Sequence, residues 1–143
     1  MKQLAIIITN LVCASLLFAQ DIQLKVSNLT PYIELDKQEI FNVPPEGLWS
    51  IATAWENEWP ANWKHASPTK FEKSGDWEIL SGRMELPEGH FLIRDAYRLE
   101  NNRIKCVRRF EWKGEQTLDS ITLSVRWQVK AQKPTTFLPG IIY

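Results

Sequence analysis

Two charged residues lie on the apolar side of a predicted hairpin, Phe91 to Trp112, and they constrain the fold more than any other feature of the sequence. In both halves of this segment apolar and polar residues alternate, as they do in a strand with one buried face. Asn101-Asn102 lies between the halves, and Asn tolerates the positive φ that a two-residue turn requires. With these residues as the turn, Asp95 faces Arg108 on the apolar side. We therefore predict a cross-strand ion pair that fixes the register of the two strands.

The predicted pair of Asp95 and Arg108 has two interpretations. A buried aspartate can act as a general base, because an adjacent guanidinium lowers the pKa of the carboxyl and keeps it ionised. A paired carboxylate inside a sheet more often serves the fold, because removing one partner leaves a buried charge. We interpret the pair as structural.

Periodicity predicts an all-β fold after the first 20 residues. Alternation at period two continues almost throughout, with turn signals about every 8–12 residues, and no segment shows a convincing helical pattern. The expected architecture is an antiparallel β-sandwich or a set of supersandwich-like curved sheets. Three local predictions are that 59–69 is a long loop containing Pro60 and Pro68, that 81–83 is a turn, and that 118–130 is one strand.

Residues 1–19 have the composition of a bacterial secretory signal. Lys2 gives the positive start, and the mainly apolar run that follows is too short and too polar to span a bilayer. A lipoprotein signal with Cys13 as the lipidated residue is disfavoured, because Val12 is larger than the residue normally found before such a cysteine. We expect an exported protein, periplasmic or extracellular, in which 20–143 form a single β-sandwich domain.

Charge and cysteine content exclude several classes of protein. The sequence holds 17 basic and 17 acidic residues, so nothing global suggests nucleic acid or an anionic membrane as a partner. Only Cys106 remains after signal cleavage, which rules out an intramolecular disulfide. Cys106 falls on the apolar side of the hairpin and is expected to be a small buried hydrophobe.

Tryptophans are the first candidate ligand contacts. Four of the seven lie within fifteen positions, and of these we single out Trp55, Trp59 and Trp63. Flat indole faces on a loop or sheet are suited to stacking against sugar rings, which present C–H groups to the ring face while their polar groups stay hydrated. The alternative is that these large side chains fill the core of a curved sheet.

Basic residues on the outer side of the hairpin are the second candidate. Arg94 faces Arg109 and Arg98 faces Lys105 in the predicted register, and like charges placed opposite each other destabilise a sheet. Arg126, on the outward side of the next predicted strand, adds a further charge. An acidic ligand such as a uronate, sulfated sugar or phosphate would neutralise Arg94, Arg98 and Arg109. The alternative is a solvated face neutralised by Glu111 and other nearby acids.

Motifs for catalysis, metal binding or a cofactor are not evident in the sequence. There is no nucleophile elbow, phosphate-binding loop or cysteine pair, and His65 and His90 do not belong to a metal-binding spacing. We therefore expect no cofactor or metal, and we do not expect this chain alone to be an enzyme.

Three segments resemble a known group of proteins: Gly89–Leu99, Val107–Trp112 and the closing Phe137–Tyr143. They resemble the N-terminal, supersandwich-like β-sandwich of large exported bacterial carbohydrate-active enzymes of the glycoside hydrolase type. The resemblance implies a non-catalytic module whose partner is a downstream catalytic domain of the same polypeptide. An apolar final segment agrees with an N-terminal fragment of a longer protein. The alternatives are an autonomous carbohydrate-binding module and a structural or adhesion domain that uses an exposed edge strand.

Overall fold

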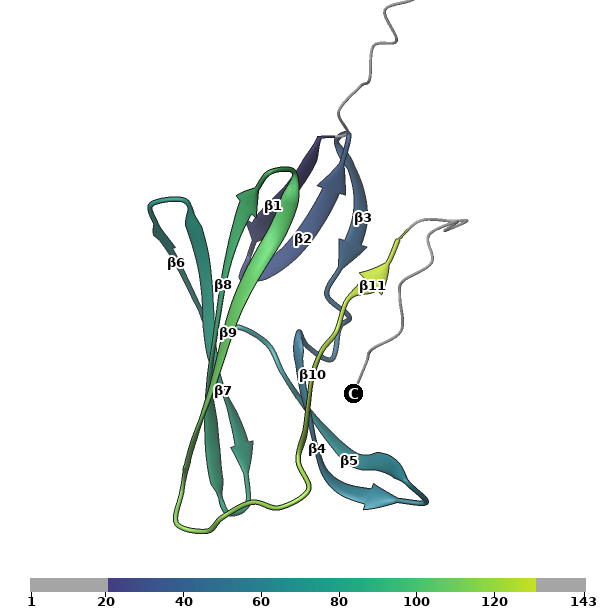
Figure 1. Ribbon diagram of the computed structural model, residues 1–143, viewed down its shortest axis with the longest axis vertical. Helices are drawn as coiled ribbons and strands as arrows, with labels where there is room; N and C mark the ends of the chain where they lie inside the picture. The colour runs from purple at the N-terminus through teal and green to yellow at the C-terminus, as the bar shows by residue number, and fades with distance from the viewer. Residues whose placement is uncertain (1–20, 131–143) are drawn as a thin grey trace, which may run out of the picture.

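The computed structural model describes residues 21–130, and these form an all-β, sandwich-like fold of three antiparallel sheets (Figure 1). The prediction of an all-β antiparallel fold is therefore confirmed. Within residues 21–130 no helix has the length and apolar character needed to cross a bilayer. The predicted signal and the closing apolar segment, Phe137–Tyr143, lie outside the described residues.

Each sheet combines strands from one continuous part of the chain, and two of the sheets add a late strand. The first sheet has the order β1 (Ile22–Ser27), β2 (Thr30–Leu35), β3 (Gln38–Asn42) and β11 (Gln128–Val129). The second has the order β10 (Thr122–Val125), β4 (Trp49–Glu56) and β5 (Trp59–Ala66). The third has the order β6 (Lys70–Ser74), β7 (Trp77–Leu86), β8 (Gly89–Glu100) and β9 (Arg103–Gly114).

Four hairpins share one kind of turn. In each turn both connecting residues have positive φ, and the first of the two is Asn or Asp. A two-residue turn with positive φ at both positions matches the right-handed twist of the flanking strands, and Asn and Asp tolerate this conformation better than most residues. The four turns are Asn28-Leu29, Asp36-Lys37, Asn57-Glu58 and Asn101-Asn102.

The register of the β8–β9 hairpin is the one predicted from the sequence. Asp95 is the cross-strand partner of Arg108, and Asn101-Asn102 forms the turn. The two strands stay in register without a bulge from Glu100 down to Gly89. This hairpin is therefore the long, regular half of the third sheet.

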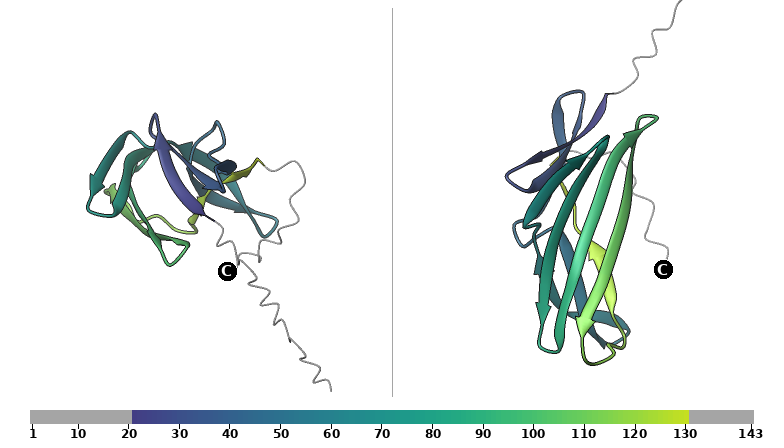
Figure 2. Two further views of the ribbon diagram at one scale, coloured as in Figure 1. Left: turned by 90° about the horizontal axis from the view of Figure 1, so that it is seen from above. Right: turned by 90° about the vertical axis from the view of Figure 1, so that its left-hand side faces the viewer.

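The hydrophobic core lies between the second and third sheets, and Figure 2 shows the long strands of the third sheet in front of the shorter second sheet. Both Trp49 and Ile51 are completely buried on β4, and Leu80 and Ile93 meet them from β7 and β8. The first sheet covers one end of this core, where β1 contacts β8 and β9.

The predicted loop over 59–69 is wrong, because residues 59–66 form strand β5. The two prolines suggested a loop, yet β5 is the outer strand of its sheet. Proline is tolerated on an edge strand, where its missing N–H removes no ladder hydrogen bond. Pro60 therefore sits within β5, opposite Trp55.

The predicted turn at 81–83 is also wrong, because β7 runs through it without a break. Gly82 serves packing there, since a Cβ at this position would lie only 2.6 Å from Cζ3 of Trp49. The predicted strand 118–130 is instead divided into β10 and β11. It breaks because β10 pairs with β4 in the second sheet while β11 pairs with β3 in the first.

Cys106 is exposed, against the expectation that it would be buried. It lies on β9, the edge strand of the third sheet, where Lys105 and Val107 are exposed as well. The side of the strand that carries Cys106 was correctly inferred, because Cys106 pairs with Tyr97. The other sheets do not cover this part of the edge.

Candidate functional site

The most exposed large aromatic surface of the described residues lies on the β4–β5 hairpin. Trp55 is 48 % exposed, Trp59 is 70 % exposed and Trp63 is 38 % exposed. Trp49 starts the same hairpin and is completely buried. The hairpin thus begins in the core and carries its remaining indoles into solvent, and we call residues 49–66 the tryptophan hairpin.

Two of the exposed indoles are fixed by their own N–H groups. Nε1 of Trp55 donates to the carbonyl of Ser120 at 3.0 Å, and Nε1 of Trp63 donates to the carbonyl of Pro60 at 3.1 Å. Since the N–H group of each of these indoles is already hydrogen-bonded, only the ring faces remain free to contact a ligand. The hairpin therefore presents two flat indole rings whose orientation is fixed by hydrogen bonds to backbone carbonyl groups.

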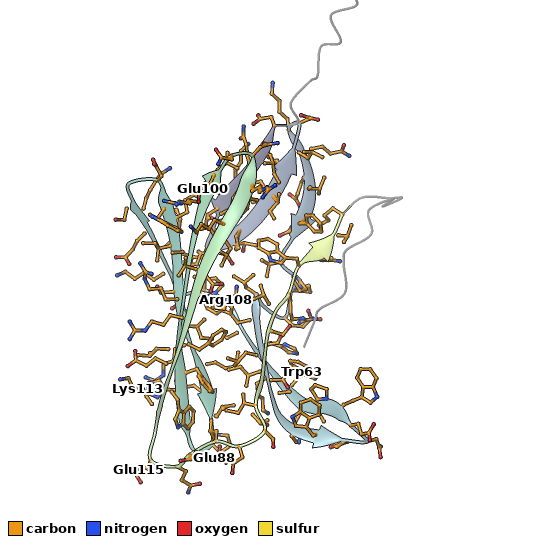
Figure 3. All side chains as sticks on the ribbon, in the orientation of Figure 1. Trp63, Glu88, Glu100, Arg108, Lys113 and Glu115 are labelled. Carbon is orange, nitrogen blue, oxygen red and sulfur yellow. The ribbon has the colours of Figure 1, made fainter. Side chains whose placement is uncertain are left out.

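Trp63 borders two hollows of the surface, and Figure 3 labels it on the second sheet, away from the outer face of β9. The smaller hollow has a volume of about 270 Å³, and we call it the Arg126 hollow; it is lined by Ser50, Trp63, His65, Ser124 and Arg126. The larger has a volume of about 470 Å³ and lies between the hairpin, the β7–β8 turn and residues 118–121.

Hydrogen bonds define the chemistry of the Arg126 hollow. Nδ1 of His65 lies 2.7 Å from Oγ of Ser50 and 3.4 Å from Nη1 of Arg126. A guanidinium can only donate, so in the contact between Arg126 and His65 the Nδ1 atom is the acceptor. Ser50 is 1 % exposed and its hydroxyl group lies against His65, so it is closed to a substrate. Arg126 and Ser124 are the donors that the lining of this hollow offers to a ligand.

Sequence reasoning treated His65 as an isolated residue and did not connect it with Ser50. The sequence signal that could have connected them is Asn57-Glu58, which forms the same kind of two-residue turn as Asn101-Asn102. With that turn, the register of β4 and β5 places Ser50 directly opposite His65. The prediction of a loop over this segment concealed the pairing.

Asp95 is the centre of a buried polar network. It is completely buried, and its carboxylate accepts hydrogen bonds from Arg108 Nε at 2.5 Å, Arg108 Nη2 at 2.6 Å, Trp49 Nε1 at 2.7 Å and Tyr97 Oη at 2.9 Å. The carboxylate is thus held by four hydrogen bonds and closed to solvent, so it is not placed to act on a substrate as a general base. Because Trp49 belongs to β4, the network also links the second sheet to the third.

Because Tyr97 is buried, the free energy of unfolding is expected to fall at alkaline pH. Burial raises the pKa of Tyr97 well above its usual range, and the negative charge of Asp95 adds to this effect. An unfolded tyrosine has a pKa of about 10, so the full contribution of Tyr97 to stability is present below this pH. Above it, the hydroxyl group of Tyr97 ionises in the unfolded chain but not in the folded one, and stability falls.

We expect the free energy of unfolding to fall by about 1.4 kcal/mol per pH unit above pH ~10 through Tyr97, and the variant Tyr97→Phe to lack this contribution. Urea unfolding of both proteins between pH 8 and 11.5 measures the two slopes. Parallel curves would contradict this assignment.

The outer arginines lie on the third sheet, and the structure does not join them with the tryptophan hairpin into one site. Arg94 does face Arg109, yet nearby acids offset the charge of the cluster. Arg98 pairs with Glu100 at 2.8 Å and lies 4.6 Å from the ring centre of Trp77. Arg109 lies 3.7 Å from Glu111, whose pKa is lowered mainly by Lys113 and also by Arg109. These contacts favour a solvated, self-neutralised face.

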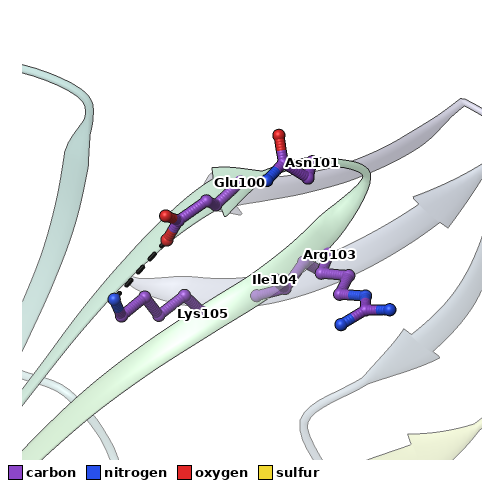
Figure 4. Close-up of a pocket in the computed structure, with 5 residues that line it drawn as sticks. All are labelled: Glu100, Asn101, Arg103, Ile104 and Lys105. Atoms are coloured by element: carbon purple, nitrogen blue, oxygen red, sulfur yellow. Dashed lines mark ion pairs between the residues drawn. The ribbon is translucent and has the colours of Figure 1, made fainter.

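A further hollow of about 550 Å³ lies at the tip of the β8–β9 hairpin (Figure 4). Its described lining comes from residues 100–105 alone, and Lys105 Nζ lies 3.5 Å from a Glu100 oxygen. No aromatic side chain takes part in this lining. The tip is therefore a weaker candidate than the tryptophan hairpin.

No protein-family model matches the chain, and no curated protein or solved structure matches it either. The described residues define an all-β, sandwich-like protein whose candidate site is an aromatic surface with polar hollows beside it.

Proposed function

We propose that this chain is a non-catalytic β-sandwich module of an exported bacterial protein and that it binds carbohydrate through the tryptophan hairpin. The observation that carries the proposal is the exposure of Trp59 and Trp63, 70 % and 38 %, on one face of the hairpin, whereas the register places Trp55 on the other face. Large apolar side chains gathered at one exposed place mark a binding surface more often than they serve stability.

Carbohydrate is the ligand class that suits this surface best. A sugar ring has apolar C–H faces and a rim of hydroxyl groups, so it needs flat apolar walls with hydrogen-bonding groups beside them. Trp63 supplies such a wall to both neighbouring hollows, and the larger one adds Asn62, Lys64 and Asp119. A ligand that crosses the hairpin would meet indole faces and polar groups in turn.

Our proposal includes a place for the module in a larger protein. The resemblance of its hairpin segments to the N-terminal domains of carbohydrate-active enzymes supports a role beside a downstream catalytic domain that degrades carbohydrate. An autonomous carbohydrate-binding module is the alternative. Affinity of the isolated chain for a glycan favours the autonomous form, and affinity that appears only with the catalytic domain attached favours the accessory role.

Replacing Trp59 or Trp63 with Ala is expected to weaken glycan binding at least tenfold. Each substitution removes an aromatic face whose stacking and buried area contribute more than about 1.4 kcal/mol, which equals a factor of ten. Affinity electrophoresis against a panel of neutral and acidic polysaccharides measures the effect. Where binding needs the catalytic domain, the same variants are tested in that longer protein.

Phe71→Ala is the matched control for this experiment. Phe71 lies on β6 in the third sheet and is 38 % exposed, the same fraction as Trp63. It should leave retention by the polysaccharide unchanged. Equal binding by the wild-type chain, Trp59→Ala and Trp63→Ala would exclude the tryptophan hairpin as the glycan-binding surface.

A further inference from the structure

We infer that the Arg126 hollow binds a carboxylate group, so that the preferred ligand is an acidic carbohydrate containing uronic acid residues. This inference rests on the proposed function and specifies the class of sugar. It assigns the acidic ligand to the second sheet, whereas the sequence pattern had pointed to arginines on the third.

The described lining of the hollow contains a guanidinium and no carboxylate. Arg126 contributes a guanidinium whose side chain is 31 % exposed, and its Nη1 lies 3.4 Å from His65 Nδ1. Ser124, from β10, contributes a hydroxyl group to the same lining. Carboxylate oxygens accept hydrogen bonds only, so a donor-rich lining complements them better than it complements a neutral hydroxyl group.

Arg126 keeps part of its guanidinium available for a ligand. The two side-chain contacts that it makes within residues 21–130, to Glu46 at 3.2 Å and to His65 at 3.4 Å, both use Nη1. Arginine binds carboxylates most favourably through two parallel N–H groups, and Nε with Nη2 provides such a pair. A bound uronate can therefore add to the Glu46 contact rather than first displace it.

Glu46 is the acid that competes for Arg126, and it is not among the residues that line the hollow. Its side chain is 53 % exposed, so the pair with Arg126 lies at the solvent side of the hollow. An exposed ion pair of this kind contributes little by itself. The charge of Arg126 is thus only partly neutralised before a ligand binds.

The size and walls of the hollow fit one acidic sugar residue. Its volume of about 270 Å³ lies just below the ~300–1,000 Å³ of sites for larger ligands. Trp63 lines the same hollow as Arg126, so the ring and the carboxylate of one residue would meet the indole and the guanidinium together. Neighbouring sugar units of the same chain would then extend over the rest of the tryptophan hairpin.

Isothermal titration with oligogalacturonate and with its fully methyl-esterified form tests the inference, because the two probes differ in the carboxylate alone. We expect the wild-type chain to bind the acid at least tenfold more tightly than the ester, with a smaller difference at 1 M salt. Arg126→Gln should lower affinity for the acid at least tenfold and change affinity for the ester less than twofold.

Two further variants separate ligand binding from a structural effect. Glu46→Gln removes the competing carboxylate and should raise affinity for the acid about twofold to fivefold, a gain that loss of structure cannot produce. Arg83→Gln, an exposed arginine paired with Glu85 on the third sheet, should leave both affinities unchanged. If Arg126→Gln does not fold, the Glu46→Gln result still decides.

Equal affinity of the wild-type chain for acid and ester would overturn this inference, and so would acid binding that both Arg126→Gln and Glu46→Gln leave unaltered. In these cases the proposed function stands if Trp59→Ala still weakens binding. Failure of the chain to bind any polysaccharide of the panel, alone or joined to its catalytic domain, would overturn the proposed function and this inference together.

Discussion

Replacing Asp95 with Ala is expected to lower the free energy of unfolding by about 3–5 kcal/mol, which is a large part of the stability of a small domain. The carboxylate is completely buried and accepts hydrogen bonds from Trp49, Tyr97 and Arg108. Without it, the indole N–H and the tyrosine hydroxyl lose their acceptor inside the core. Urea unfolding followed by tryptophan fluorescence measures the loss.

The surface pair of Arg83 and Glu85 gives the control for the Asp95 experiment. Both side chains are more than half exposed on the same sheet, so Glu85→Ala should cost less than about 1 kcal/mol. A loss below 1 kcal/mol for Asp95→Ala would show that the network does not hold the fold together.

Replacing Trp49 with Ala is expected to lower the free energy of unfolding by about 3–5 kcal/mol as well. The side chain is completely buried, and its removal leaves a cavity against Gly82 in addition to an unfilled hydrogen bond at Asp95. The same denaturation experiment applies, with Trp59→Ala as the matched substitution on the exposed part of the hairpin. That variant should lose less than about 1 kcal/mol.

Trp49→Phe divides the loss at Trp49 into its two causes. Phenylalanine fills most of the volume and cannot donate to Asp95, so the remaining loss reports the indole N–H. The effects of Trp49→Phe and Asp95→Ala should be less than additive, because both remove the same hydrogen bond. Strict additivity would contradict a direct link between the two sheets at this point.

The β8–β9 hairpin could be predicted from the sequence in detail because three local signals agree. The alternation of apolar residues gives the faces, Asn101-Asn102 gives the turn, and the pairing of Asp95 with Arg108 gives the register. The exposure of Trp59 and Trp63 excludes the alternative that they fill the core, and their contact with a ligand stays a prediction. Each of these features depends on residues that are close in sequence or directly opposed across one turn.

Features set by distant contacts could not be predicted. Gly82 looks like a turn residue, and only its contact with Trp49 explains why β7 continues through it. Pro60 looks like a strand breaker until β5 is known to be an edge. The Arg126 hollow joins residues of three strands, and Arg126 follows β10, whose pairing with β4 spans some seventy residues of chain.

The late position of β10 and β11 has a consequence for the order in which the protein can fold. Every other strand pair joins consecutive strands, which can zip together as soon as they leave the ribosome. The outer edges of β3 and β4 gain their partners only when residues 122–129 arrive. Until then the nascent chain carries these two unpaired edges in addition to the outer edges of β1, β5, β6 and β9, and unpaired edges expose a folding intermediate to aggregation. The rate at which this segment docks therefore limits how long a newly synthesised molecule is at risk.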